Sequence, residues 1–272
     1  MMLSKVGMRD FQRYSRKKHR TADGRLLVDG WRSLEAVLNA GVDIEWLLIA
    51  EGADHGELPP GLIDRLESSA RKVDHIPAKQ LKLVSSTVTP SGLLAKVAWA
   101  PSAAEKLLER IGSSGRSAVR PKSPRQVVVV ADGVAEPGNL GAIIRTADWF
   151  GVSGVYAGLG SVELTNPKVV QATMGSLFQM PVGSGDSTAS FVGALKADGF
   201  TVVSLELGGG TDMRDMLWPD QLVLVVGNEA RGVSSEVTRL ADERMMIPRF
   251  GKAESLNAAA SVAVILGRIM LK

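Results

Sequence analysis

Three segments in the second half of the chain carry polar residues that could do chemistry. The first, DGVAEPGNLGAIIRTADWFGV, places Asn139 at a turn and Arg145 six residues later. The second, LVLVVGNEARGVS, places Glu229 just after an apolar run, and the third, MMIPRFGKAESLNAAASVAVILG, contains Ser255 and Asn257. The first segment directly follows an apolar run typical of a buried strand, at 127–131, and the other two begin with such a run. Because the ends of parallel strands meet at one edge of a doubly wound sheet, we expect these polar side chains to gather in one site.

Taken singly, each polar cluster also has a purely structural explanation. Asn139 suits the N-cap position of the following helix, and Arg145 suits a surface ion pair. We expect the last helix to begin near Ser255, with Ser255 and Asn257 in its first turn, where Glu254 and Ser255 would act only as caps. Three such clusters in succession favour a functional site, because caps alone do not require this set of residues.

The elements around these clusters predict an α/β fold with two domains. In the second half, apolar runs alternate with helical patterns, which predicts a parallel sheet; the runs cover residues 127–131, 202–205 and 222–226. The first hundred residues alternate in the same way on a smaller scale. Between them, GSSGRSAVRPKSP has almost no apolar content and is typical of a linker. We therefore expect an N-terminal domain over residues 1–100, a linker over 101–124 and a second domain over 125–272.

Composition restricts the chemistry further. The 272 residues include no cysteine, which excludes disulfides and thiolate chemistry, makes a metal site unexpected and is compatible with a cytoplasmic location. No secretory peptide or membrane span is predicted, because the longest apolar stretch, 258–271, contains Gly267 and Arg268 and is better explained as a buried helix. The three histidines, His19, His55 and His75, all precede the linker, so an imidazole base is excluded from the second domain.

Basic residues crowd the start of the chain, although the net charge of the whole is only +3. We expect them to form an arm that contacts RNA phosphates. The candidate residues are Arg9, Arg13, Arg16, Lys17, Lys18 and Arg20. A solvated, frayed terminus is an equally open explanation of such a charge run.

The order of the three segments resembles the motifs of the SpoU/TrmH-like methyltransferases of the SPOUT superfamily. The matching patterns are N-x5-R, G-N-E-A-R-G and I-P-x5-E-S-L-N, and the resemblance covers roughly 127–272. GRLLVDGWRSLEAVLNAGV and STVTPSGLLA resemble the small L30e-like substrate-binding domain that precedes many such enzymes. The chain departs from the usual pattern at Asp29, where glutamate is commoner, and at 258–260, where three alanines replace valine and serine.

The resemblance implies a parallel sheet tied in a trefoil knot, a homodimer whose active sites use both subunits, and S-adenosylmethionine as cofactor. It implies transfer of a methyl group to a ribose 2′-hydroxyl of structured RNA, with ribosomal RNA favoured over transfer RNA. The implied catalytic residues are Asn139, Arg145, Glu229, Ser255 and Asn257, and the implied cofactor contacts are Gly227, Asn228, Ile247 and Leu256.

The proton acceptor is not fixed by these motifs. A guanidinium with a pKa above about 12 is a poor base, so our hypothesis is that Arg145 clamps the phosphate beside the target ribose while Asn139 orients the hydroxyl.

Two other functions remain as alternatives. One is a dinucleotide-dependent oxidoreductase, suggested by G-L-G at 158–160, but Glu163 stands where the last glycine of G-x-G-x-x-G belongs. The other is a non-catalytic RNA-binding or ribosome-assembly protein, which binding of the cofactor would exclude.

Overall fold

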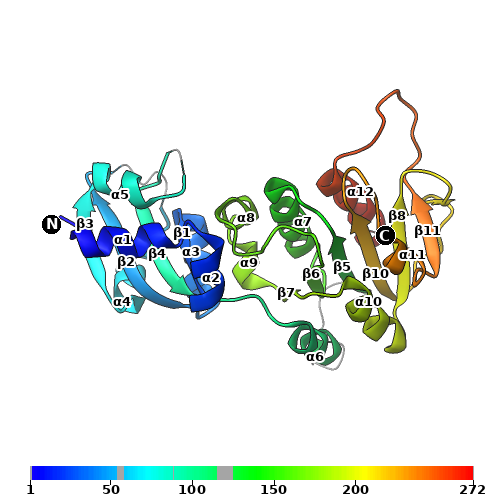
Figure 1. The fold of residues 1–272 in the computed structure, drawn as a ribbon, viewed down its shortest axis with the longest axis horizontal. Coiled ribbons are helices and arrows are strands. Elements are labelled where there is room, and N and C mark those ends of the chain that lie inside the picture. Colours follow the sequence, from blue (N-terminus) through cyan, green and yellow to red (C-terminus); the bar gives the residue numbers. More distant parts are fainter. Residues whose placement is uncertain (1, 54–57, 88, 115–124, 272) are drawn as a thin grey trace. The chain divides into compact units, whose positions relative to one another are not determined.

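The computed structural model describes residues 2–53, 58–87, 89–114 and 125–271, and the chain divides into two compact units (Figure 1). The first unit comprises Met1–Ala100 and Thr165–Gln179, and the second comprises Pro101–Leu164 and Met180–Lys272. The described part of the predicted linker contains helix α6 (Ala104–Ser114), and residues 115–124 lie outside the described ranges. The domain boundaries that we expect from the sequence stay a prediction.

The first unit is built on a four-stranded mixed sheet with the strand order β1-β4-β2-β3. The strands are β1 (Arg25–Asp29), β2 (Asp43–Glu51), β3 (Val73–Pro77) and β4 (Leu93–Ala98). Its helices are α1 (Lys5–Arg13), α2 (Lys17–Asp23), α3 (Trp31–Asn39), α4 (Leu62–Ser69), α5 (Ala78–Val84), α8 (Pro167–Thr173) and α9 (Ser176–Gln179). The alternation of helices and strands predicted for the first hundred residues is confirmed.

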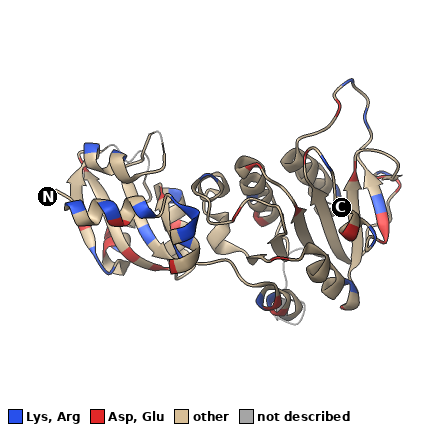
Figure 2. Ribbon diagram, viewed as in Figure 1, with Lys and Arg blue, Asp and Glu red and all other residues tan. Residues whose placement is uncertain are grey.

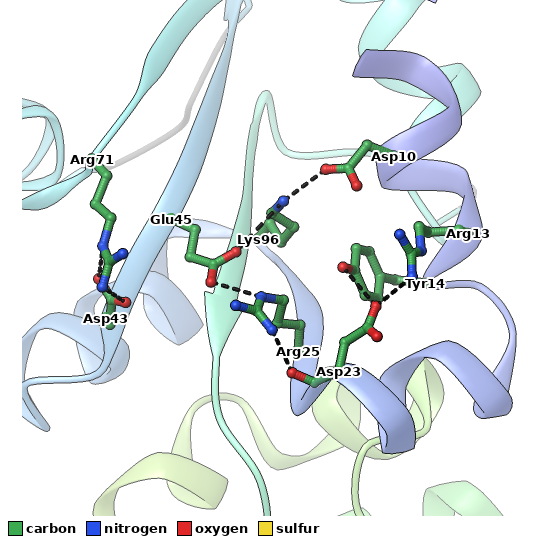
Figure 3. Close-up of polar contacts among 9 residues, drawn as sticks. All are labelled: Asp10, Arg13, Tyr14, Asp23, Arg25, Asp43, Glu45, Arg71 and Lys96. Carbon is green, nitrogen blue, oxygen red and sulfur yellow. Dashed lines mark hydrogen bonds and ion pairs between the residues drawn. The ribbon is translucent and has the colours of Figure 1, made fainter. Parts of the chain in front are cut away.

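The start of the chain is ordered, so a frayed terminus is the wrong explanation of its charge. Phe11 and Tyr14 are buried at one face of the α1 region and anchor it to the unit. Lys96 of β4 donates to Asp10 of α1 at 2.7 Å and lies 3.5 Å from Glu45 of β2, as Figure 3 shows. Apolar packing and ion pairing together fix α1 against the sheet.

The second unit is built on a seven-stranded sheet with the order β7-β6-β5-β10-β8-β11-β9. All its strand pairs are parallel, which confirms the parallel sheet predicted for this half of the chain. The strands are β5 (Gln126–Asp132), β6 (Gly154–Ala157), β7 (Val182–Ser184), β8 (Thr201–Glu206), β9 (Thr211–Asp212), β10 (Gln221–Gly227) and β11 (Glu243–Met246). Besides α6, the helices are α7 (Pro137–Trp149), α10 (Thr188–Ala197), α11 (Ser235–Thr238) and α12 (Ala258–Met270). The central strands β5 and β10 are buried on both faces, which explains their continuous valine-rich runs.

Two helices begin at other residues than the sequence suggests. Helix α7 begins at Pro137 and its N-cap is Glu136, whose carboxylate accepts from the Asn139 backbone N–H, so the prediction of Asn139 as the cap was wrong. Proline suits the first position of a helix because its missing N–H has no partner there. Helix α12 begins at Ala258, capped by Asn257, which places its start three residues later than predicted.

The last part of the chain returns across the sheet. From β11, which lies beyond β8, the chain runs through residues 247–257 to α12, which packs on α7 and β10 on the other side of β8. Figure 1 shows this connection looping out beyond the sheet before α12. Periodicity alone predicts an unknotted sheet, whereas this return path fits the knot that the resemblance implies. Within the described residues, no helix is both long and apolar enough to cross a membrane.

Candidate active site

Three of the five predicted catalytic residues meet in one hydrogen-bonded group. Asn257 donates from Nδ2 to Oδ1 of Asn139 at 2.7 Å, and Asn139 donates from Nδ2 to Oε1 of Glu229 at 2.8 Å. They come from the cap of α12, the first turn of α7 and the loop after β10. Side chains 90 and 118 positions apart in the sequence are therefore in contact.

The orientation of each amide in this group follows from the capping of α12. Oδ1 of Asn257 accepts from the backbone N–H groups of Ala259 and Ala260, at 2.9 and 3.2 Å. Its NH2 group must therefore point away from the helix, toward Asn139, whose oxygen accepts. The NH2 group of Asn139 is then left to face the carboxylate of Glu229. One helix cap thus sets the donors and acceptors of the whole group.

Arg145 is not part of this group. Its side chain is exposed and makes no hydrogen bond or ion pair with any residue that the structure describes. Six residues along an α-helix turn a side chain by roughly 120° from its starting direction and advance it by about 9 Å, which separates Arg145 from Asn139. Ser255 is also exposed, and it lies in the segment before α12 rather than in the helix.

Two adjoining clefts of about 240 and 210 Å³ lie beside the hydrogen-bonded group. One follows the returning segment and includes Ile247, and the other reaches the loop after β10 and includes Gly227, Asn228 and Glu229. Ser255 and Leu256 line both clefts. The four residues predicted to contact a cofactor therefore surround one connected hollow.

Sequence reasoning missed one wall of this hollow, formed by Leu205, Glu206 and Leu207 at the end of β8. The signal was available, since the apolar run at 202–205 is followed by a carboxylate just as the run of β10 is followed by Glu229. Ser204 donates to the Glu206 carboxylate at 3.2 Å, which helps to hold this side chain at the strand end.

The loop after β10 is shaped by Asn228. Its Nδ2 donates to the Gly133 carbonyl at 2.8 Å, and its Oδ1 accepts from the backbone N–H groups of Ala230 and Arg231. Gly227 has to be glycine, because a Cβ there would lie 2.1 Å from the carbonyl carbon of Gly232. The Asn228 side chain therefore holds the loop, and the loop presents Glu229 to Asn139.

The predicted RNA-binding residues divide into two kinds. Arg9, Arg13, Arg16, Lys17 and Lys18 are exposed on the α1–α2 region, and Arg13 also pairs with Asp23 at 2.6 Å. Arg20 requires a correction, because it is only 4% exposed and donates to the backbone carbonyls of Tyr14 and Ser15 at 2.9 and 2.8 Å. A side chain used in this way holds the turn between the helices and is not available to a phosphate.

The G-L-G segment has none of the surroundings of a dinucleotide site. It follows β6, and the next described helix, α8, begins only at Pro167. Without a helix N-terminus directly after the glycines, a pyrophosphate has no dipole to bind.

Comparison with known proteins identifies the family of the chain. Residues 126–267, just over half of the chain, match the SpoU rRNA Methylase family, and residues 7–95 match the MRM3-like substrate binding domain. The chain is 29% identical over 259 residues to the 23S rRNA (guanosine(2553)-2′-O)-methyltransferase RlmP of Bacillus subtilis strain 168, across 95% of this chain and 94% of that protein.

Two solved structures resemble the whole chain. The SpoU methyltransferase AviRb of Streptomyces viridochromogenes, in complex with AdoMet, has a TM-score of 0.80 at 25% identity and covers 98% of both chains. An AdoMet-bound rRNA methyltransferase of Sinorhizobium meliloti has a TM-score of 0.80 at 25% identity and covers 98% of this chain and 96% of its own. The predicted family and its α/β fold are confirmed, and this chain belongs to the SpoU rRNA methylase family.

Proposed function

We propose that this chain transfers the methyl group of S-adenosylmethionine to a ribose 2′-hydroxyl of structured RNA. Ribosomal RNA is the first candidate substrate, because the Bacillus subtilis relative is a 23S rRNA methyltransferase, and transfer RNA is the second. Membership of the SpoU family bears out the predicted enzyme class. The observation that carries the proposal is the contact of Asn139, Glu229 and Asn257 beside the hollow at the strand ends.

The hollow has the chemistry that S-adenosylmethionine requires. Leu205, Leu207, Ile247 and Leu256 give apolar walls for an adenine, and the loop backbone offers polar groups. Carboxylates at the rim, including Glu206, suit a ligand with a positively charged sulfur and a positively charged amino group. When bound, the cofactor would supply an electrophilic methyl group, which passes to the ribose oxygen in an in-line displacement with S-adenosylhomocysteine as the leaving group.

The residues of the chain would act by positioning. Asn139 is held from both sides, by Asn257 and Glu229, so its amide has a fixed direction toward an incoming hydroxyl. Arg145 has no partner among the described residues and its guanidinium is free to clamp the phosphate beside the target ribose through two parallel hydrogen bonds. In this proposal that phosphate accepts the hydroxyl proton, so no side-chain base is required.

The position of Arg145 supports a homodimer as the working form. Asn139 and Arg145 point in different directions from α7, so one chain alone does not bring both to one ribose. A second copy could supply Arg145 to the site that contains Asn139. We also propose a cytoplasmic location, where RNA and the cofactor occur together.

The test is to incubate the protein with methyl-labelled S-adenosylmethionine and unmodified total RNA, separate the RNA by size and look for alkali-resistant dinucleotides, which 2′-O-methylation leaves behind. Label in large ribosomal RNA is the expected result, and label in transfer RNA would replace the first candidate with the second. Binding of RNA without binding of S-adenosylmethionine would overturn the enzyme and support a non-catalytic RNA-binding protein.

A further inference from the structure

A second hollow lies within the first unit, apart from the strand-end site. It has a volume of about 490 Å³, which is in the range of pockets that hold small organic ligands. Its walls are α1, the turn into α2, and the end of α5 with the two serines that follow. Figure 2 shows that lysines and arginines are frequent along α1 and α2, and three arginines of this region line the hollow.

The charged residues of the lining are the arginines Arg9, Arg13 and Arg16, and His19 lies beside them. Among the residues that the structure describes, no aspartate or glutamate lines the hollow. The side chains of Arg9 and Arg16 are exposed and form no hydrogen bond or ion pair with another described residue. Two guanidinium groups thus face the same hollow with their hydrogen-bonding capacity unused.

The acidic residues of α1 and α2 are held elsewhere, as Figure 3 shows. Asp10 accepts from Lys96 of β4 at 2.7 Å, and Asp23 accepts from Arg13 at 2.6 Å and from the Tyr14 hydroxyl at 3.1 Å. The Asp23 carboxylate is the counter-charge of Arg13, and neither carboxylate contacts Arg9 or Arg16, so among the described residues these two cations have no counter-charge. The hollow is therefore suited to an anion.

The rest of the lining is suited to a flat apolar group. Leu83 of α5 is 60% exposed, and Leu27, Val84 and Tyr14 lie behind it. The hydroxyls of Ser15 and Ser86 add exposed polar groups at the edge. Two guanidinium groups beside an exposed apolar side chain can bind a nucleotide, with its phosphate on the guanidiniums and its base on the apolar side chain. The face of a base is accessible for such a contact only where the RNA is unpaired.

We propose that this hollow binds an unpaired nucleotide of the RNA substrate, with Arg9 and Arg16 on its flanking phosphates and its base against Leu83. The inference rests on the proposed function, since it assumes an RNA substrate. The proposal assigns recognition of single-stranded RNA to a defined pocket within the basic surface of α1 and α2.

The test is direct binding of short RNA to the full chain. The probes are fluorescently labelled hexauridylate and hexaadenylate, and a blunt duplex of the same length, titrated at several salt concentrations. The parent protein should prefer the single strands. The variant R9Q/R16Q should bind them about tenfold more weakly or worse, and its plot of log affinity against log salt should be less steep by about 1.4, since each phosphate contact on a single strand contributes about 0.7.

A second variant distinguishes the contribution of the base contact from that of the phosphate contacts. Leu83→Ser should weaken binding by about threefold to tenfold with no change in the salt slope, because it removes an apolar contact and no charge. Arg71→Gln is the matched control, since Arg71 is an exposed arginine of the same unit that is already paired with Asp43, and it should bind like the parent.

Equal binding of duplex and single strand, or unchanged binding by R9Q/R16Q, would overturn the nucleotide pocket. These measurements require no methyl transfer, so they are independent of the catalytic assay. A protein that methylates RNA but fails here would lose only this inference, whereas a protein that binds these probes but neither methylates RNA nor binds S-adenosylmethionine would lose the proposed function.

Discussion

Asn257 combines two roles that substitution can separate, the capping of α12 and the hydrogen bond to Asn139. Asn257→Ala removes both. Loss of an N-cap side chain costs about 1 kcal/mol, and loss of an exposed neutral hydrogen bond costs about 0.5–1.5 kcal/mol. The free energy of unfolding should therefore fall by about 2 kcal/mol, with a decrease in Tm of about 2–4 °C for each kcal/mol.

Asn257→Ser should keep the first role and lose the second. Serine caps helices about as well as asparagine, so the capping contribution to the free energy of unfolding should change by no more than about 0.5 kcal/mol. The remaining loss should come from the hydrogen bond to Asn139 alone and should be about 0.5–1.5 kcal/mol. The shorter hydroxyl does not span the 2.7 Å contact that the amide makes with Asn139. Both variants should lower kcat for methyl transfer by about tenfold, equivalent to 1.4 kcal/mol, because Asn139 loses its fixed orientation.

The assays are denaturant unfolding for stability and initial rates of methyl transfer to RNA at saturating cofactor. Asn166→Ala is the matched control, since Asn166 caps α8 through the Lys168 backbone N–H at 2.9 Å and lies outside the hydrogen-bonded group. It should lower stability without lowering kcat. A serine variant with the turnover of the parent would refute the role of the Asn257–Asn139 bond, and a serine variant as unstable as the alanine one would refute the cap.

Three further outcomes are expected. Arg145→Lys should lower kcat/KM for RNA at least about tenfold with unchanged cofactor affinity, because lysine cannot bind a phosphate through two parallel bonds; full activity in steady-state kinetics would contradict the clamp. Arg20→Met should lower the free energy of unfolding by about 2–4 kcal/mol in urea, because two backbone carbonyls lose their donors; an unchanged midpoint would show that these bonds are dispensable. Burial, followed by the hydrogen bond to Asp23, raises the pKa of Tyr14 to about 12, and burial also raises the pKa of Tyr156. Unfolded tyrosine ionises near pH 10, so the stability from Tyr14 is complete below about pH 10 and is lost as the pH rises toward 12. Tyrosinate absorbance that rises near pH 10 in the folded protein would contradict this.

The ends of the central strands were predictable from the sequence. A strand of a parallel sheet is buried on both faces and forms a continuous apolar run, so the first polar residue after the run marks the strand end. The runs of β5 and β10 are short and rich in valine, which favours buried strands over helices, and polar residues directly after such strands lie at the sheet edge. This reasoning brought Asn139, Glu229 and Asn257 to one place before any contact was known.

Helix starts were less predictable because several good caps stand close together. In ESLNA, Ser255 and Asn257 are both strong N-cap residues, and the choice between them depends on the bond from Asn257 to Asn139, which the local sequence does not contain. At α7 the signal was present in Pro137, which suits the first helical position and points to Glu136 as the cap.

Helices α1 and α2 were missed because charge obscured their apolar pattern. Leu3, Gly7, Phe11 and Tyr14 are all buried and recur at helical spacing, but the arginines and lysines between them suggest an arm. Burial of Arg20 could not be foreseen, since it depends on carbonyls that face inward only after the turn between the helices has formed.

The return of the chain from β11 to α12 also determines when the hollow at the strand ends is completed in a newly synthesised chain. Asn139 and Glu229 leave the ribosome well before Asn257, and the hollow lacks a wall until residues 247–257 have crossed back over the strand ends. Contacts between residues 118 positions apart form slowly because a long loop must close first. A nascent chain with a complete set of central strands therefore still lacks part of the proposed cofactor site, and we expect it to bind S-adenosylmethionine only after residues 247–257 have crossed.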